Sequence, residues 1–296
     1  MSSSKYLSIQ LCHSLSMYSQ HLQWHPLIYI VIFLCQCYTP YMARIIAFSN
    51  QKGGVGKTTT CVNMAAFLAE MGKKVLIVDV DPQGNASTGV GVQKSSSTKT
   101  IYDVICNECD ISDAVQLTQI KGLEIVPATH DLAGAEIELV RMRSGREKIL
   151  AELLKKVRAS YDFICIDCPP SLGLLTVNAL SAADAIIIPI QCEFFALEGI
   201  SQLVNTVRLI RNQGINPSLD IDGVVFTMVI SRSTLTEQVA NEILKFFGKK
   251  VFRTRIPRNV RLAEAPSHGM PITLYDRKCP GAIAYLELTK EYLTRV

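Results

Sequence analysis

The chain has 296 residues, 48% of them hydrophobic and 19% charged, so it can bury one large core or two modest ones. Its formal net charge of +4 argues against a generally basic nucleic-acid coat, so any DNA contact has to come from a few placed arginines. These features favour a folded soluble enzyme, and the charge alone identifies no partner.

Residues 1–42 differ in composition from the rest of the chain. They contain one charged residue, Lys5, and an apolar stretch from Leu27 to Cys35, which is shorter than the roughly 20 residues that span a bilayer. A weak basic start and the lack of a small-residue cleavage site argue against a signal peptide. Met42 stands directly before "ARIIAF", where a strand-first domain would begin. We expect a non-conforming extension, either from an upstream start codon or as a disordered tail, with no stable membrane insertion; a membrane-associating tail is the alternative.

After Met42 the sequence alternates short β-branched runs with longer segments of helical period. Strands are predicted at "RIIAFS", "KKVLIVDVD", "LEIVPA", "DFICIDCP", "AIIIPI", "GVVFTMVI" and "VFRTRIP". Helices are predicted from Lys57 to Met71, at "LEGISQLVNTVRLIRNQG" and at "LTEQVANEILKFFG". The alternation predicts an α/β fold with a doubly wound, mostly parallel sheet and helices on both faces, formed by residues 43–296 as a single domain. Residues 93–100 are predicted to form a surface loop, too short to divide the chain.

The first strand leads into "NQKGGVGKTTT", residues 50–60, which runs directly into the first helix. Such a glycine-rich turn places backbone N–H groups around an anion at the positive end of the helix dipole. Lys57 can reach the β- and γ-phosphates, and the Thr58 hydroxyl can bind Mg²⁺. The strict G-x-x-x-x-G-K-[ST] pattern fails, because its first glycine would fall at Gln51. The predicted nucleotide-binding residues of this loop are Lys52, Gly53, Gly54, Val55, Gly56, Lys57, Thr58 and Thr59.

Aspartates follow two of the predicted buried strands. Asp167 ends the apolar run of "DFICID", where a carboxylate can hold Mg²⁺ through its water shell. Asp79 and Asp81 close "VLIVDVD", and because residues two apart on a strand point to the same face, both are expected to face the phosphates. One of them is expected to orient the attacking water, and Asp79 is a further candidate metal ligand.

The chain has ten cysteines, and several, such as Cys165 and Cys192, lie inside apolar runs. We interpret them as reduced core residues of a cytosolic protein. Two pairs have CxxC spacing, Cys106 with Cys109 and Cys165 with Cys168, but the second pair spans a strand, where the tight turn cannot form. A metal or redox role is the lesser alternative for the first pair.

The segments "KGGVGKTTT", "DVDPQGNAS", "DCPPSLG" and "IPRNVRLAEAPSHG" together resemble the ParA/Soj chromosome-partitioning ATPases, of the deviant Walker A superfamily that also contains MinD and the nitrogenase iron protein. The resemblance covers essentially all of residues 43–296. It implies a P-loop NTPase fold and hydrolysis of ATP with Mg²⁺. It also implies a cytoplasmic, nucleoid-associated protein whose ATP-bound homodimer binds DNA without sequence preference. Release would follow when a ParB-type partner stimulates hydrolysis, driving chromosome or plasmid segregation.

The same resemblance implies roles for individual residues. Lys52 matches the lysine that reaches the nucleotide of the other subunit, a second cation that makes pairing depend on the γ-phosphate. Lys57 would serve its own subunit, Asp81 would position the hydrolytic water, and Asp167 would be the Walker B aspartate. The implied catalytic residues are therefore Lys52, Lys57 and Asp81.

The resemblance further implies a base-binding segment and a DNA-binding face. Pro257 and Asn259 match the segment that borders adenine. Arg232 and Arg261 match surface arginines that contact DNA phosphates, and Arg258 lies near them. Many relatives have "D-x-R-T" where this chain has "ISRST", so the details of the loop around Arg232 stay open.

Other functions are weighed against this one. A MinD-like membrane-cycling ATPase should end in an amphipathic helix with a basic face, but in "GAIAYLELTKEYLTRV" Glu287 and Glu291 offset Lys290 and Arg295, which predicts a helix packed on its own domain. An iron-protein-like reductase would need cysteines in glycine-rich contexts that this chain lacks. For a nucleotide-stabilised DNA-binding regulator, the extension lacks the charge and helical pattern of an operator-binding motif.

Overall fold

The alternating pattern folds into a sheet layered between helices. The computed structural model describes residues 42–92, 95, 98–193, 196–230 and 234–296, so the predictions for residues 1–41 lie outside the described range. Met42–Val296 forms one compact unit. The strands are β1 (Arg44–Phe48), β2 (Val75–Asp79), β3 (Gln116–Leu117), β4 (Leu123–Val126), β5 (Phe163–Asp167), β6 (Ala185–Gln191) and β7 (Asp220–Thr227). The helices are α3 (Lys57–Glu70), α4 (Asn85–Gly89), α5 (Ile101–Ile105), α6 (Ile111–Ala114), α7 (Leu132–Arg141), α8 (Ile149–Val157), α9 (Leu174–Ala182), α10 (Ala196–Asn212), α11 (Thr234–Phe247), α12 (Val260–Glu264), α13 (Ile272–Tyr275) and α14 (Pro280–Leu293), with short 3₁₀ turns at Arg158–Ser160, Gly248–Lys250 and Ala265–His268.

The sheet has the strand order β3-β4-β2-β5-β1-β6-β7. Every neighbouring pair is parallel except β3 with β4, which confirms a mostly parallel sheet. The chain leaves β1 toward β2 on one side and later crosses from β5 to β6 on the other. This reversal places a crevice beyond the carboxyl ends of the central strands, where ligands bind in doubly wound sheets.

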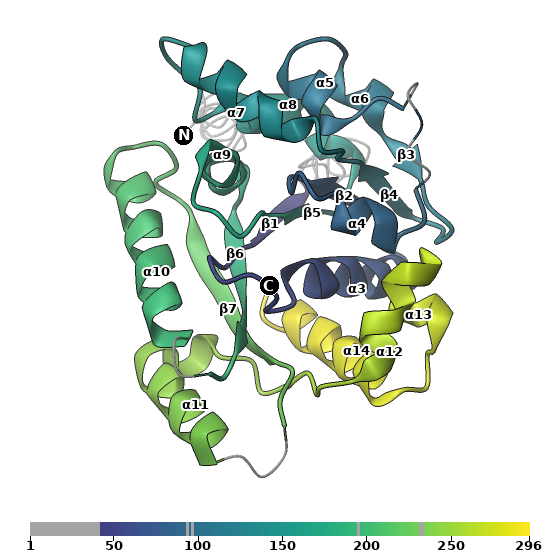
Figure 1. Ribbon diagram of the computed structural model, residues 1–296, viewed down its shortest axis with the longest axis vertical. Helices are drawn as coiled ribbons and strands as arrows, with labels where there is room; N and C mark the ends of the chain where they lie inside the picture. The colour runs from purple at the N-terminus through teal and green to yellow at the C-terminus, as the bar shows by residue number, and fades with distance from the viewer. Residues whose placement is uncertain (1–41, 93–94, 96–97, 194–195, 231–233) are drawn as a thin grey trace, which may run out of the picture. The chain divides into compact units, whose positions relative to one another are not determined.

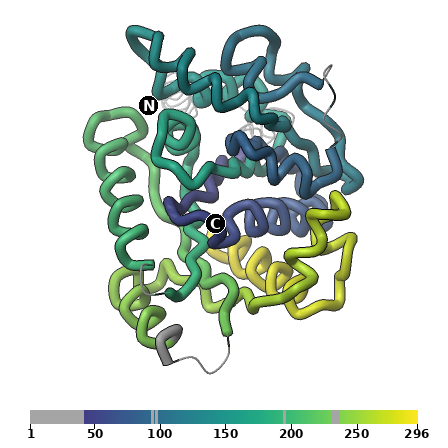
Figure 2. Tube along the Cα trace, in the orientation of Figure 1, coloured from purple at the N-terminus to yellow at the C-terminus, as the bar shows by residue number. Residues whose placement is uncertain are grey.

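Helices cover both faces of the sheet, as predicted (Figures 1 and 2). Alternate residues of β1 enter different cores, because successive strand side chains point to opposite faces. Ile46 and Phe48 pack on the side of α3 and α14, whereas Ile45 and Ala47 pack on the side of α7 to α11. The phosphate loop that follows β1 is therefore anchored from both layers.

The C-terminal helix α14 packs on its own domain, which confirms the prediction from its charge pattern. Tyr285, Leu288 and Tyr292 are buried in the same core as α3. The Tyr292 hydroxyl donates to Asp222 at 3.0 Å, so this helix is tied to β7 as well. Among the helices of the described residues, none combines the length and apolar character that crossing a membrane requires.

Two strand predictions need correction. "VFRTRIP" forms only isolated bridges, at Val251 and Pro257, because the backbone N–H groups of Arg253 and Thr254 donate to the Glu291 carboxylate of α14 instead of to a strand. The second predicted strand ends at Asp79, two residues earlier than expected.

The predicted burial of the cysteines in apolar runs is confirmed. Cys165 and Cys168 have no exposed surface, and Cys192 is buried. Cys106 and Cys109 are half-buried thiols.

Candidate functional site

The phosphate loop lies between the carboxyl end of β1 and the start of α3. Gly54 and Gly56 have φ angles of 73° and 86°, a left-handed region that favours glycine. Gly56 is the N-cap of α3, and within the described part of the chain this helix has neither a side-chain cap bond nor an acidic residue in its first turn. The first N–H groups of α3 are therefore available to an anion at the positive end of the helix.

Polar groups from neighbouring strands hold this loop in shape. The hydroxyl of Thr227, the last residue of β7, donates to the carbonyl oxygen of Val55 at 2.8 Å. The Asn50 side-chain amide donates to the Pro189 oxygen at 2.8 Å, and its Oδ1 accepts from the backbone N–H of Lys52 at 3.0 Å. These hydrogen bonds tie the loop to β6 and β7.

The two lysines of the loop have different surroundings. Lys57 is 6% exposed, and its amine donates to the carbonyl oxygen of Lys52 at 3.1 Å. Burial lowers the pKa of Lys57, and the nearby charge of Asp167 opposes this effect. The Lys52 amine instead forms an ion pair with Glu193, and 34% of the Lys52 side chain stays exposed. The loop therefore carries one internal and one surface cation.

Asp167 and Thr58, the predicted metal ligands, lie together beside the loop. The Thr58 hydroxyl donates to Asp167 Oδ2 at 2.7 Å, while Oδ1 is buried without a hydrogen-bond partner among the described residues. Burial raises the pKa of Asp167 well above its ordinary value, and the charge of Asp79, its register neighbour on β2, adds to the rise. A hydroxyl beside a carboxylate with an unpaired oxygen is a donor set that fits Mg²⁺, whose charge would favour the ionised carboxylate.

Asp79 and Asp81 do not share the geometry that we expected. Because β2 ends at Asp79, the strand alternation does not extend to Asp81. Asp79 Oδ2 accepts from the backbone N–H and the hydroxyl of Ser87 at 2.8 and 2.7 Å, and its Oδ1 accepts from the backbone N–H of Asp81 at 3.2 Å. Burial raises the pKa of Asp79 to about 6. With both oxygens engaged, Asp79 suits support of the turn that carries Asp81 better than direct metal binding.

Pro257 and Asn259 line a pocket of about 330 Å³ together with Gly56 and Thr59 of the phosphate loop. The Oδ1 atom of Asn259 is buried and has no hydrogen-bond partner within the described ranges. A buried acceptor of this kind gains free energy when a ligand donor reaches it. The two residues expected near the base are therefore brought beside the residues expected near the phosphates.

Of the predicted DNA-binding arginines, Arg232 lies outside the described residues. The Arg261 side chain is 54% exposed on α12, where it pairs with Glu264 at 2.9 Å and with Asp276 at 3.6 Å. Arg258 is exposed and lies before α12, at the edge of the base pocket. Arg258 and Arg261, the two candidates that lie within the described residues, thus belong to one short segment next to the candidate nucleotide site.

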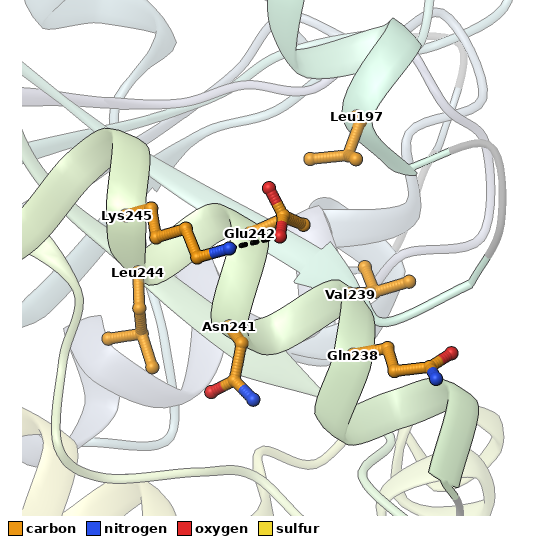
Figure 3. A pocket seen from close by; sticks show the side chains of 7 residues that line it. All are labelled: Leu197, Gln238, Val239, Asn241, Glu242, Leu244 and Lys245. Atoms are coloured by element: carbon orange, nitrogen blue, oxygen red, sulfur yellow. Dashed lines mark hydrogen bonds and ion pairs between the residues drawn. The ribbon is translucent and has the colours of Figure 1, made fainter.

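A wider hollow of about 840 Å³ lies elsewhere, between the start of α10 and α11 (Figure 3). Leu197 approaches it from α10, and the other lining residues, including Val239 and Leu244, come from α11. Among the described residues that line it, the charged ones are Glu242 and Lys245, which pair with each other at 2.6 Å. The hollow lacks a phosphate-binding loop, so the nucleotide site is assigned to the smaller pocket beside Gly56.

Three residues of the site were not predicted from the sequence: Glu193, Thr227 and Ser87. Thr227 is the last residue of β7, and Glu193 lies two residues beyond the end of β6. The strands predicted from the sequence end at Ile190 and Ile230 instead, so the strand-end criterion that identified Asp167 selects neither residue. Ser87 carries no such signal, because it lies within the short helix α4.

Comparison with known proteins identifies the family to which this site belongs. A family model described as an AAA domain matches residues 43–221. The chain is 55% identical over 250 residues to the sporulation initiation inhibitor protein Soj of Bacillus subtilis, covering 84% of this chain and 98% of that protein. It is 51% identical over 254 residues to the chromosome partitioning protein ParA of Myxococcus xanthus, covering 86% and 89%. A solved cobyrinic acid a,c-diamide synthase from Mycobacterium smegmatis, with bound ATP analogue and magnesium, is similar with a TM-score of 0.73 and 37% identity, covering 84% of this chain and 93% of that one. On these grounds the chain belongs to the ParA/Soj family of chromosome-partitioning ATPases.

Proposed function

We propose that this protein is an ATP-hydrolysing DNA-partition motor that pairs with a second copy around bound ATP. The observation on which the proposal rests is that one of the two lysines of the phosphate loop is buried and the other lies at the surface. Lys57 is buried, with its amine on the carbonyl oxygen of Lys52, whereas the Lys52 amine lies at the surface against Glu193. One buried cation serves the chain's own nucleotide, so Lys52 is available to the nucleotide of a paired copy.

The residues of the site fit hydrolysis of ATP. Magnesium, when bound, neutralises charge on the β- and γ-phosphate oxygens. The Thr58 hydroxyl and, through water, the Asp167 carboxylate are the groups that would hold the ion. Lys57 binds the β- and γ-phosphates, and Asp81 accepts a hydrogen bond from the attacking water and orients its oxygen toward the γ-phosphorus. As the new phosphorus–oxygen bond forms, the bond to the bridging oxygen breaks, ADP leaves with that electron pair, and the proton of the attacking water passes to an oxygen of the released phosphate.

Asn259 is the contact for the adenine base in this proposal. Its buried, unpaired Oδ1 is an acceptor, and the amino group at position 6 of adenine can donate to it. ATP is therefore the nucleotide that we propose.

DNA binding is assigned to Arg261 and Arg258, with Arg232 as a third contact. Guanidinium groups that contact phosphates give affinity that is independent of sequence and sensitive to salt. Arg261→Glu is expected to weaken binding equally on unrelated DNA duplexes and to leave nucleotide binding unchanged. A loss confined to one sequence would contradict this face.

The partner that we propose is a ParB-type DNA-binding protein that stimulates hydrolysis, and the place of action is the nucleoid in the cytoplasm. The alternatives are weaker. A MinD-like membrane cycle would need a free basic helix at the C-terminus, whereas α14 is packed against the core that contains α3. A regulator that uses ATP only for stability would not need a surface lysine beside the phosphates. We also propose that residues 43–296 form the working ATPase domain, so a chain starting at Met42 should hydrolyse ATP like the full chain.

The proposal is tested by comparing Lys52→Ala with Lys57→Ala. Lys52→Ala is expected to bind fluorescent ATP analogues as a monomer but to show no ATP-induced pairing in light scattering, with turnover lost. Lys57→Ala is the matched control and is expected to lose nucleotide binding itself. If Lys52→Ala still pairs and hydrolyses ATP like the parent, the shared site is wrong.

A further inference from the structure

Glu136 makes an unusual contact with the loop that follows Asp167. This loop, residues 168–173, joins β5 to α9, and Gly173 is the N-cap of α9. A methyl group added at Gly173 would lie 2.2 Å from Oε1 of Glu136 and 3.2 Å from its Cδ atom. The carboxylate therefore occupies the space that any other residue at position 173 would need for its side chain.

The contact combines charge with shape. α9 has no side-chain cap bond from its own N-cap residue, and the backbone N–H of Leu175 points to Glu136 Oε1 at 3.5 Å. A carboxylate at the positive end of a helix is stabilising. α9 has no acidic residue in its own first turn, and the Glu136 carboxylate of α7 supplies the negative charge at its N-terminus instead.

The loop that Glu136 contacts begins between the strand that leads into the phosphate loop and the turn that carries Asp81. The backbone N–H of Cys168 donates to the oxygen of Phe48, the last residue of β1, at 3.3 Å. The backbone oxygen of Asp167 accepts from the N–H of Val80, next to Asp81, at 3.0 Å. The start of this loop is therefore bonded both to the strand that leads into the phosphate loop and to the turn that carries Asp81.

We propose that Glu136 is a positioning residue for ATP turnover: seated on Gly173, its carboxylate fixes the loop after Asp167 and so sets the placing of Asp167 and Asp81. The inference rests on the proposed function, because it assigns meaning to those two aspartates. Glu136 touches no nucleotide in this account and acts only through the loop. The Thr176 hydroxyl of α9 donates to the oxygen of Ser171 at 2.6 Å, so the loop is bonded to α9 as well as to Glu136 of α7.

The test compares steady-state ATP hydrolysis of Glu136→Ala, Glu136→Gln and Glu138→Gln in the full chain. Glu136→Ala is expected to lower kcat about 10-fold with KM for ATP within about two-fold of the parent, since misplaced groups slow chemistry more than they weaken binding. Glu136→Gln keeps the shape without the charge and should retain part of kcat. Glu138, on the same helix but exposed and paired with Arg141, is the matched control and should behave like the parent.

A second arm uses the clash at Gly173. Gly173→Ala is expected to lower kcat in the parent chain but to cause no further loss in a Glu136→Ala background, where the methyl group has room. Such non-additivity is the signature of two groups that share one space. A purely structural role would lower the melting temperature and leave kcat unchanged, and that result overturns the inference, as does additivity of the two changes. Absence of ATP hydrolysis in the parent chain would instead contradict the proposed function itself.

Discussion

Replacing Asp79 by asparagine should change how stability depends on pH. Burial raises the pKa of Asp79 from 3.8 to about 6 in the folded chain. A carboxyl group whose pKa rises on folding favours the folded state below its unfolded pKa, and this contribution is lost as the pH rises through the folded pKa. The shift of about two units corresponds to about 3 kcal/mol between full protonation and full ionisation. Between about pH 5 and about pH 7.5, linkage gives a loss on the order of 1 kcal/mol in the free energy of unfolding.

The assay is urea unfolding of the parent and of Asp79→Asn at these two pH values, without nucleotide or magnesium. Asparagine has one acceptor oxygen, so it can accept from Ser87 or from the backbone N–H of Asp81 but not from both, and that loss is equal at both pH values and cancels in the comparison. The parent should lose on the order of 1 kcal/mol more than the variant on going to the higher pH. Asp167 adds to the difference in the same direction, because the charge of Asp79 helps to raise its pKa.

Glu152→Gln, an exposed change on α8, corrects for effects of removing a charge in general. A difference between parent and Asp79→Asn that is equal at both pH values would refute the reasoning. A difference of the opposite sign would do so as well.

Two further predictions concern packing around the sheet. Gly223→Ala should destabilise the protein by about 1–3 kcal/mol, because the new methyl group would lie 2.2 Å from Phe252. Gly134→Ala, a change inside α7, should stabilise the protein by about 0.4–1 kcal/mol, because the new methyl group would lie 3.5 Å from its nearest neighbour. Thermal unfolding of both variants checks the two predictions, and shifts of the same sign would contradict them. Tyr292→Phe should lower the free energy of unfolding by about 1.5–3 kcal/mol, because it removes a hydrogen bond to the charged Asp222, and an unchanged urea midpoint would contradict this.

Much of the fold could be predicted because its signals are local. The order of strands and helices follows from period and β-branching, and the glycine-rich turn after β1 marks where the chain must bend toward α3. The segment from Val251 to Pro257 has the pattern of a strand but is not one. Phe252 and Ile256 donate their backbone N–H groups to oxygens of β7, but the N–H groups of Arg253 and Thr254 between them donate to Glu291. Arg253 and Glu291 are 38 positions apart, so no local pattern contains the deciding contact.

The site divides in the same way. The loop residues and Asp167 could be predicted from short motifs, whereas the groups that fix the loop come from other strands. Thr227 is 172 residues from its partner Val55, and Glu193 is 141 residues from Lys52. The expectation that Asp79 and Asp81 share a face required β2 to continue to Asp81. The strand ends at Asp79 instead, where the carboxylate accepts hydrogen bonds from Ser87.

The ion pair of Lys52 with Glu193 has a consequence for the pairing proposed above. Any phosphate group that attracts this ammonium has to displace a carboxylate that already neutralises it. A triphosphate brings more negative charge to that exchange than a diphosphate does, so in the proposed pair competition between anions adds to pocket shape in distinguishing ATP from ADP. In that pair, the threshold for assembly depends on Glu193 as much as on Lys52.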